Sequence, residues 1–279
     1  MRNLKVILSA LIAVVAIVAV VGLNSCNKTD DSVSTAEASK TTITDYANIV
    51  TSFTSDFDDE LISGEESVLK SASLASCFTV TVTKNADGAF YPRIWTVDYL
   101  GGTCTLLSGN TKEGKIHVSL TDLWKNKGSL KTVTFEDYYF NGNKMEGVKT
   151  ILNTGLNEKG NLTFLKTVSD ASLKYADGSS ISWECKKTSE LIAGGSTILF
   201  ADDVYSVTGT GSGVNLDGKK YTLTITTPMI YKNGCFYPVS GIVKIDTVGG
   251  DLQTIDYGNG ECDNLAKLTV GGVTTEIKL

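Results

Sequence analysis

From Cys77 onward, apolar and polar residues alternate in short runs, and this period of two limits the possible folds more than any other feature. The run Phe78–Thr83 reads FTVTVT, which puts aromatic and aliphatic side chains on one face and hydroxyl groups on the other. Such alternation is typical of a half-buried β-strand. Similar runs recur along the rest of the chain, at 115–120, 131–140, 161–168, 179–185, 203–208, 221–226, 241–246, 253–257 and 266–270.

The segments between these runs contain turn-forming dipeptides such as Asn141-Gly142, Asp177-Gly178 and Asp217-Gly218. Two-residue turns of this kind need positive φ angles, which Gly and Asn supply at little cost, and they join adjacent antiparallel strands. No stretch of crossover-helix length separates the runs, so parallel βαβ units are excluded. The sequence therefore predicts an all-β, antiparallel, hairpin-rich meander, arranged as a sandwich or a curved sheet.

A short helical segment is expected before the strands, over residues 46–76. Its apolar residues Tyr46, Ile49, Phe53 and Phe57 recur at spacings of three and four, which is the period of an amphipathic helix. The acidic run 56–60 lies within it. This run lacks the alternating ligands and central glycine of a calcium loop, so we interpret it as a solvated helix face and expect no metal site.

The first thirty residues predict where the protein is found. Arg2 and Lys5 precede an apolar run over residues 6–22, which ends at the segment Leu23-Asn24-Ser25-Cys26. A basic leader, an apolar core and a small-residue cleavage site define a signal peptide. Here the site ends on a cysteine and resembles the lipobox of bacterial lipoproteins. The resemblance implies a signal peptide over residues 1–25, acyl chains such as palmitate on Cys26, and a lipidated flexible tether over residues 26–45.

A retained transmembrane helix is the alternative, since the apolar run is just long enough for a hydrocarbon core of roughly 30 Å. It ends without the basic or aromatic anchors of a membrane interface, which favours cleavage. Each buried lipid CH₂ contributes about 0.8 kcal/mol, so more than one acyl chain would attach the protein stably to the membrane.

Five cysteines remain after Cys26, and two pairs of them share one spacing: Cys77 with Cys104, and Cys235 with Cys262. Exported proteins keep disulfides, so we predict these two bonds, with Cys185 left over. Buried free thiols at related core sites are the alternative. In the second hairpin, this pairing predicts that Asp246 lies opposite Asp251.

The same pairs belong to an internal repeat. Residues 96–104 read TVDYLGGTC, and residues 254–262 read TIDYGNGEC. We therefore predict two related β modules, over residues 77–156 and 157–279. Two similar hairpins within a single sheet are the alternative.

These segments, together with residues 135–142 and 202–210, resemble surface lipoproteins of the Bacteroidetes, a family without an agreed activity. The likeness extends over most of residues 77–279. It implies an all-β exported part, anchored by lipid in the outer membrane and exposed at the cell surface. No catalytic or ligand-binding residue follows from it.

Residues that carry enzyme chemistry are scarce. The single histidine, His117, lies inside a predicted strand, without a nucleophile motif or a second histidine for a metal site. No cofactor fingerprint is present, so we expect neither catalytic residues nor a cofactor. The formal net charge of −6 argues against nucleic acid as a partner, because phosphate binding needs Lys and Arg.

Aromatic residues near predicted loops favour binding instead. Tyr91, Trp95, Tyr139 and Tyr237 are the candidate ligand-binding residues, because exposed aromatic faces stack on sugars or peptides. Filling of the core is the alternative for each. We therefore predict a non-catalytic binding or adhesion module for glycan or protein. A structural or assembly subunit of an outer-membrane complex is the alternative, and a glycan-acting enzyme is the third hypothesis. The sequence leaves the oligomeric state open.

Overall fold

A computed structural model describes residues 77–279, except for 84, 86, 106–109, 198–199 and 236. The predicted signal peptide, the lipidation site Cys26, the tether and the helical segment 46–76 all lie outside the described residues. Helices are almost absent from the described part, where a single 3₁₀ turn, η1 (Phe200–Asp202), interrupts the strands. No helix there is long and apolar enough to span a membrane.

Thirteen strands form one antiparallel sheet, so the all-β prediction is confirmed. Their bounds are β1 Thr79–Thr83, β2 Arg93–Thr105, β3 Thr111–Leu120, β4 Leu130–Phe140, β5 Asn143–Leu156, β6 Leu162–Lys174, β7 Ser180–Ala193, β8 Val204–Val214, β9 Lys220–Lys232, β10 Ser240–Thr247, β11 Gln253–Asn259, β12 Leu265–Val270 and β13 Val273–Lys278.

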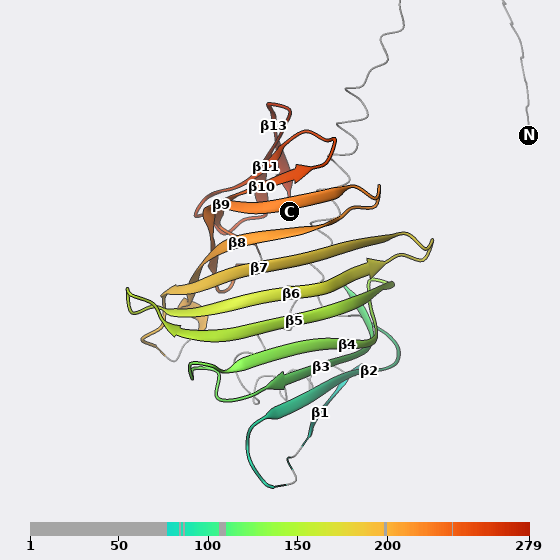
Figure 1. The fold of residues 1–279 in the computed structure, drawn as a ribbon, viewed down its shortest axis with the longest axis vertical. Coiled ribbons are helices and arrows are strands. Elements are labelled where there is room, and N and C mark those ends of the chain that lie inside the picture. The colour runs from blue at the N-terminus through green and yellow to red at the C-terminus, as the bar shows by residue number, and fades with distance from the viewer. Residues whose placement is uncertain (1–76, 84, 86, 106–109, 198–199, 236) are drawn as a thin grey trace, which may run out of the picture. The chain divides into compact units, whose positions relative to one another are not determined.

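The strands follow one another in the sheet in the order in which they occur in the chain (Figure 1). Each inner strand pairs with its predecessor and its successor, which makes the sheet a simple meander. β1 and β13 form its two edges, since each has one paired neighbour among the described strands. Of the two arrangements left open by the sequence, the described strands adopt the single sheet.

Tight turns follow the predicted chemistry. Asn141 and Gly142 have φ angles of 50° and 76° and join β4 to β5, with Phe140 directly opposite Asn143. Positive φ at both central residues matches the right-handed twist of the flanking strands, and Asn and Gly tolerate it best.

The core lies on one face of the sheet. Val97, Val243 and Ile245 have no solvent exposure, and they belong to one continuous cluster of buried residues. On β8 the corresponding positions include glycines that leave room for large neighbours. A Cβ atom on Gly211 would lie 3.1 Å from Trp183 Nε1, and one on Gly213 would lie 2.8 Å from the ring of Tyr221. The Gly-x-Gly-x-Gly stretch of β8 therefore accommodates aromatic side chains from β7 and β9.

Both predicted disulfides are present, Cys77–Cys104 and Cys235–Cys262, while Cys185 is a buried free thiol. The predicted register of the second hairpin is wrong by one residue. Ile245 lies opposite Gln253, whereas the prediction places it opposite Leu252. The backbone N–H of Gly250 bonds to the carbonyl of Thr247 and closes the turn one residue earlier than predicted.

The two repeated segments lie in β2 and β11 of the same sheet. The predicted module boundary at residue 156 falls in the turn between β5 and β6. These two strands pair along their length, from Lys144 opposite Lys174 to Leu156 opposite Leu162. The described strands are therefore continuous across the boundary.

Candidate functional site

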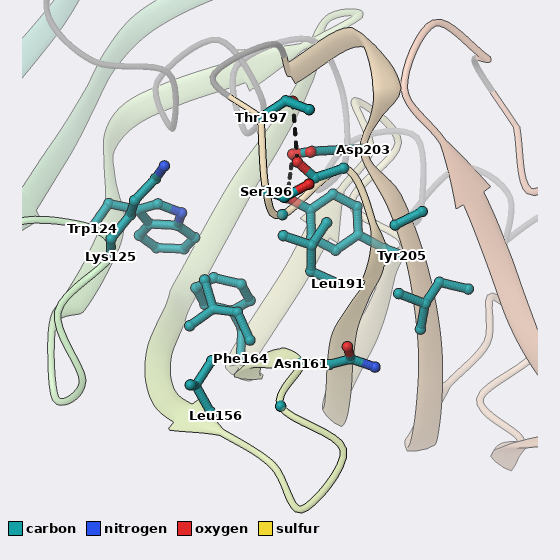
Figure 2. A pocket seen from close by; sticks show the side chains of 16 residues that line it. Trp124, Lys125, Leu156, Asn161, Phe164, Leu191, Ser196, Thr197, Asp203 and Tyr205 are labelled. Atoms are coloured by element: carbon teal, nitrogen blue, oxygen red, sulfur yellow. Dashed lines mark hydrogen bonds between the residues drawn. The ribbon is translucent and has the colours of Figure 1, made fainter.

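Three connections at one end of the sheet surround a pocket of about 560 Å³ (Figure 2). They are the β3–β4 loop, the β5–β6 turn and the β7–β8 loop. In an antiparallel meander, every second connection lies at the same end of the sheet, so segments distant in sequence meet there. The pocket volume falls within the range of roughly 300–1,000 Å³ that is usual for small-molecule sites.

Aromatic side chains form much of the wall. The rings of Trp124, from the β3–β4 loop, and Phe164, from β6, are stacked with centroids 4.5 Å apart and planes 7° from parallel. Tyr205 of β8 lines the opposite side (Figure 2). At the rim, Leu156 and Ile192 are 70% and 43% exposed. An apolar side chain exposed to this degree at a pocket rim offers contact area to a ligand.

The main acidic group of the pocket is Asp203, which is 6% exposed and lies at the end of the β7–β8 loop. The hydroxyl of Tyr205 donates a hydrogen bond of 3.1 Å to Asp203 Oδ2. Burial raises the pKa of the Asp203 carboxyl, the Tyr205 hydrogen bond lowers it, and the charges of Asp202 and Lys125 act in opposite directions. Gly194 approaches the same carboxylate so closely that a Cβ atom there would collide with it. The carboxylate is thus held between a phenol and a glycine loop.

Asn161 supplies an amide at the β5–β6 side. Its Nδ2 donates to Glu190 Oε1 at 2.7 Å, and this bond is the largest cause of the lowered pKa of Glu190. The turn itself is fixed by Asn157, whose Oδ1 accepts from the backbone N–H groups of Lys159 and Asn161, each at 3.0 Å. The amide of Asn161 is therefore held in place by its charged neighbour and by the turn.

The β3–β4 loop, which carries Trp124, is braced from β5 by Asn153. Asn153 is fully buried, and its Nδ2 donates to the carbonyl of Trp124 at 2.8 Å. Its backbone N–H and C=O bond to Ser129 and Gly128 of the same loop, at 2.9 and 2.8 Å. Within the loop, Asp122 accepts from the N–H of Leu123 and from the amide of Asn126, at 2.7 and 2.9 Å. These bonds position the indole before any ligand arrives.

The candidate residues from the sequence lie apart from this pocket. Trp95 is 4% exposed in the core, because its position on β2 faces inward, so its ring is not available to a ligand. Tyr91 lies in the β1–β2 loop, with its ring 5.0 Å from that of the exposed Phe90. Tyr139 is near the β4–β5 turn, at the other end of the sheet, and Tyr237 is in the β9–β10 connection. The structure does not bring these four residues into one site.

His117 lies on the solvent-facing side of β3, in a chain of polar contacts. Its Nδ1 is 3.1 Å from Thr96 Oγ1, and its Nε2 is 2.8 Å from Glu136 Oε2. The contact with His117, together with Lys115, lowers the pKa of Glu136. The cluster is a cross-strand ladder on an open face, and no described pocket adjoins it. Within the described residues, no group of three His, Cys, Asp or Glu side chains is placed to hold a metal ion.

Sequence reasoning missed Trp124, Phe164, Tyr205 and Asp203. One signal was present, since Trp124 lies in the polar stretch 121–129 between two strands, where a core role is not expected. The other three residues belong to different strands or loops, and only the strand order brings them together.

Searches against protein-family models, curated proteins and solved structures gave no match. The fold and the site together define a class: a disulfide-braced, single-sheet β protein with an aromatic and acidic pocket among its loops.

Proposed function

We propose that this protein is a lipid-anchored, exported binding module whose loop-end pocket holds a carbohydrate. The observation that carries the proposal is the combination of an aromatic wall with a buried carboxylate and an oriented amide in one pocket. Sugar rings present apolar C–H faces and hydroxyl edges, so a binding site needs both kinds of surface. Trp124, Phe164 and Tyr205 supply the first, and Asp203 and Asn161 the second.

The polar groups suit hydroxyl ligands. A carboxylate accepts hydrogen bonds from two neighbouring hydroxyls, and bonds to a charged acceptor contribute about 1.5–3 kcal/mol. Lys125, exposed on the opposite wall, offers donors. At about −0.3 kcal/mol per non-hydrogen atom, a disaccharide would bind in the micromolar to millimolar range. Such modest affinity per site is compatible with adhesion when many copies are displayed on one surface.

The proposed location rests on the N-terminal segment. Cleavage before Cys26 and acylation of this cysteine would place the binding module on the outer membrane, with residues 26–45 as a spacer. The two disulfides agree with an oxidising compartment outside the cytoplasm. Loss of metabolic fatty-acid labelling in Cys26→Ala, against a labelled parent protein, would support the anchor. An unlabelled parent protein would refute it.

The binding proposal is tested with the chain from residue 27 onward on a glycan array, followed by calorimetry with the best oligosaccharide. We expect saturable binding that Trp124→Ala and Asp203→Asn each weaken by about tenfold or more, the equivalent of 1.4 kcal/mol. Tyr139→Ala, at the other end of the sheet, is the matched aromatic control and should bind like the parent. No glycan binding by the folded protein, or equal affinity in Trp124→Ala, would contradict the proposal.

A further inference from the structure

Four lysines gather on the core-side face of the central strands. Lys131 of β4 lies opposite Ile151 of β5, which lies opposite Lys166 of β6, which in turn lies opposite Lys187 of β7. Lys149 occupies the adjacent row on the same face, two residues before Ile151. Directly opposed residues of neighbouring strands project from the same side of a sheet. We refer to Lys131, Lys149, Lys166 and Lys187 as the lysine face.

This face is buried. Lys131 and Lys149 are 2% and 7% exposed. Desolvation by burial lowers the pKa of Lys149 well below its ordinary value, and the nearby charges of Lys166 and Lys187 lower it further. The ammonium group of Lys187 lies 5.3 Å above the ring of Trp183.

Burial of several like charges is costly unless opposite charges compensate them. Among the charged residues that are buried in the described part of the chain, the one acid is Asp203, and it belongs to the loop-end pocket. The chemistry of this face therefore calls for carboxylates from a segment that packs on it.

The architecture calls for the same segment. A sheet buries a face by packing a second layer against it, whereas all described strands belong to one sheet. A covering segment must carry apolar side chains to meet Ile151 and Val168, which are 1% and 4% exposed, as well as acids to meet the lysines.

Residues 46–76 have this composition, and they directly precede β1 in the chain. Tyr46, Ile49, Phe53 and Phe57 repeat at helical spacing, and Asp56, Asp58, Asp59 and Glu60 follow within the same stretch. We propose that the acidic, amphipathic stretch 46–76 is the layer that covers the lysine face, with the carboxylates of 56–60 paired to its ammonium groups. As a helix, such a stretch would be about 45 Å long, enough to cross several strands. Its short link to β1 gives it a high effective concentration at this face.

Zero-length carbodiimide cross-linking of the unmodified full chain, read by mass spectrometry, tests the pairing. We expect isopeptide bonds that join residues 56–60 to Lys131, Lys149, Lys166 or Lys187. A mixture of isotope-labelled and unlabelled copies identifies bonds within one chain. Bonds between chains, or no bond from 56–60 to these lysines, would overturn the proposal.

A variant that neutralises the acids gives an independent readout. Replacing Asp56, Asp58 and Asp59 by Asn and Glu60 by Gln should raise the acetylation rate of the four lysines at least tenfold. A matched control neutralises four exposed acids of the described sheet and its loops, Glu184, Asp246, Glu261 and Glu276, and should leave these rates unchanged. Equal rates in the acid variant and the parent would count against the proposal. If the variant fails to fold, the cross-link in the unmodified protein decides.

Discussion

The two ends of the sheet differ in how their connections are stabilised. At the end opposite the pocket, turns are short and satisfy their own hydrogen bonds, as in Asn141-Gly142 and in the β8–β9 turn, where Asn215 Oδ1 accepts from the N–H of Lys219 at 2.8 Å. At the pocket end, the β3–β4 loop depends on a buried residue from another strand, Asn153 of β5. Turns of the first kind only reverse the chain, whereas braced loops hold side chains out for a ligand.

The largest effect is expected at the brace. Asn153→Ala removes the bonds to the Trp124 carbonyl and to the N–H of Gly155 and leaves buried groups unpaired, so the free energy of unfolding should fall by about 3 kcal/mol. Chemical denaturation measures this change. Glycan binding should weaken together with stability, because the indole is no longer positioned. A variant that keeps both properties would break the distinction between the two ends.

Next comes the pocket wall itself. Trp124→Ala should reduce glycan affinity by about 10- to 100-fold, because it deletes a stacking contact and an apolar surface. The midpoint of unfolding should change less than in Asn153→Ala, because Trp124 is half-buried. Calorimetry and thermal unfolding on the same samples separate the two effects.

A smaller effect, on stability alone, is expected at the opposite end. Asn141→Ala forces an alanine to the left-handed φ of 50° and should cost about 1–2 kcal/mol. Asn141→Gly avoids that strain and should cost less. Both variants should bind glycan like the parent, and a tenfold loss of affinity in either would show that the far turns take part in binding.

The smallest effect concerns the buried carboxylate. Because the pKa of Asp203 is raised in the folded state, the native protein holds this proton more tightly than the unfolded chain does. The destabilising contribution of the charged form is therefore full above the folded pKa, and it disappears as pH falls below the unfolded pKa. Asp203→Asn should be more stable than the parent at pH 7, by less than about 1 kcal/mol. The difference should vanish in acid, as denaturation at several pH values would show. A stability difference that grows in acid would contradict this assignment.

Much of the fold could be predicted from local pattern. Alternation and turn dipeptides locate most strands, and equal cysteine spacing predicts both disulfides. Strand β5 was missed because its pattern is broken. Lys149 occupies an inward position, and the register shifts between Glu146 and Val148 at a bulge. Local residue types do not report such tertiary compensation.

The site could not be predicted in the same way. Phe164 and Tyr205 have the residue types of core strands, and they meet Trp124 only because alternate connections of a meander share one end. The four aromatics chosen from the sequence were near loops in the chain, yet Trp95 faces inward and Tyr139 lies at the other end. Nearness to a turn in sequence therefore says little about which end of a sheet a side chain occupies.

Backbone amide chemical shifts during titration with the glycan that binds best test the central claim most directly. The account predicts perturbations confined to the connections 121–129, 157–161 and 194–205, with Asn141, Gly142 and the β8–β9 turn unchanged. Perturbations centred on those opposite turns, or spread evenly over the sheet, would contradict it.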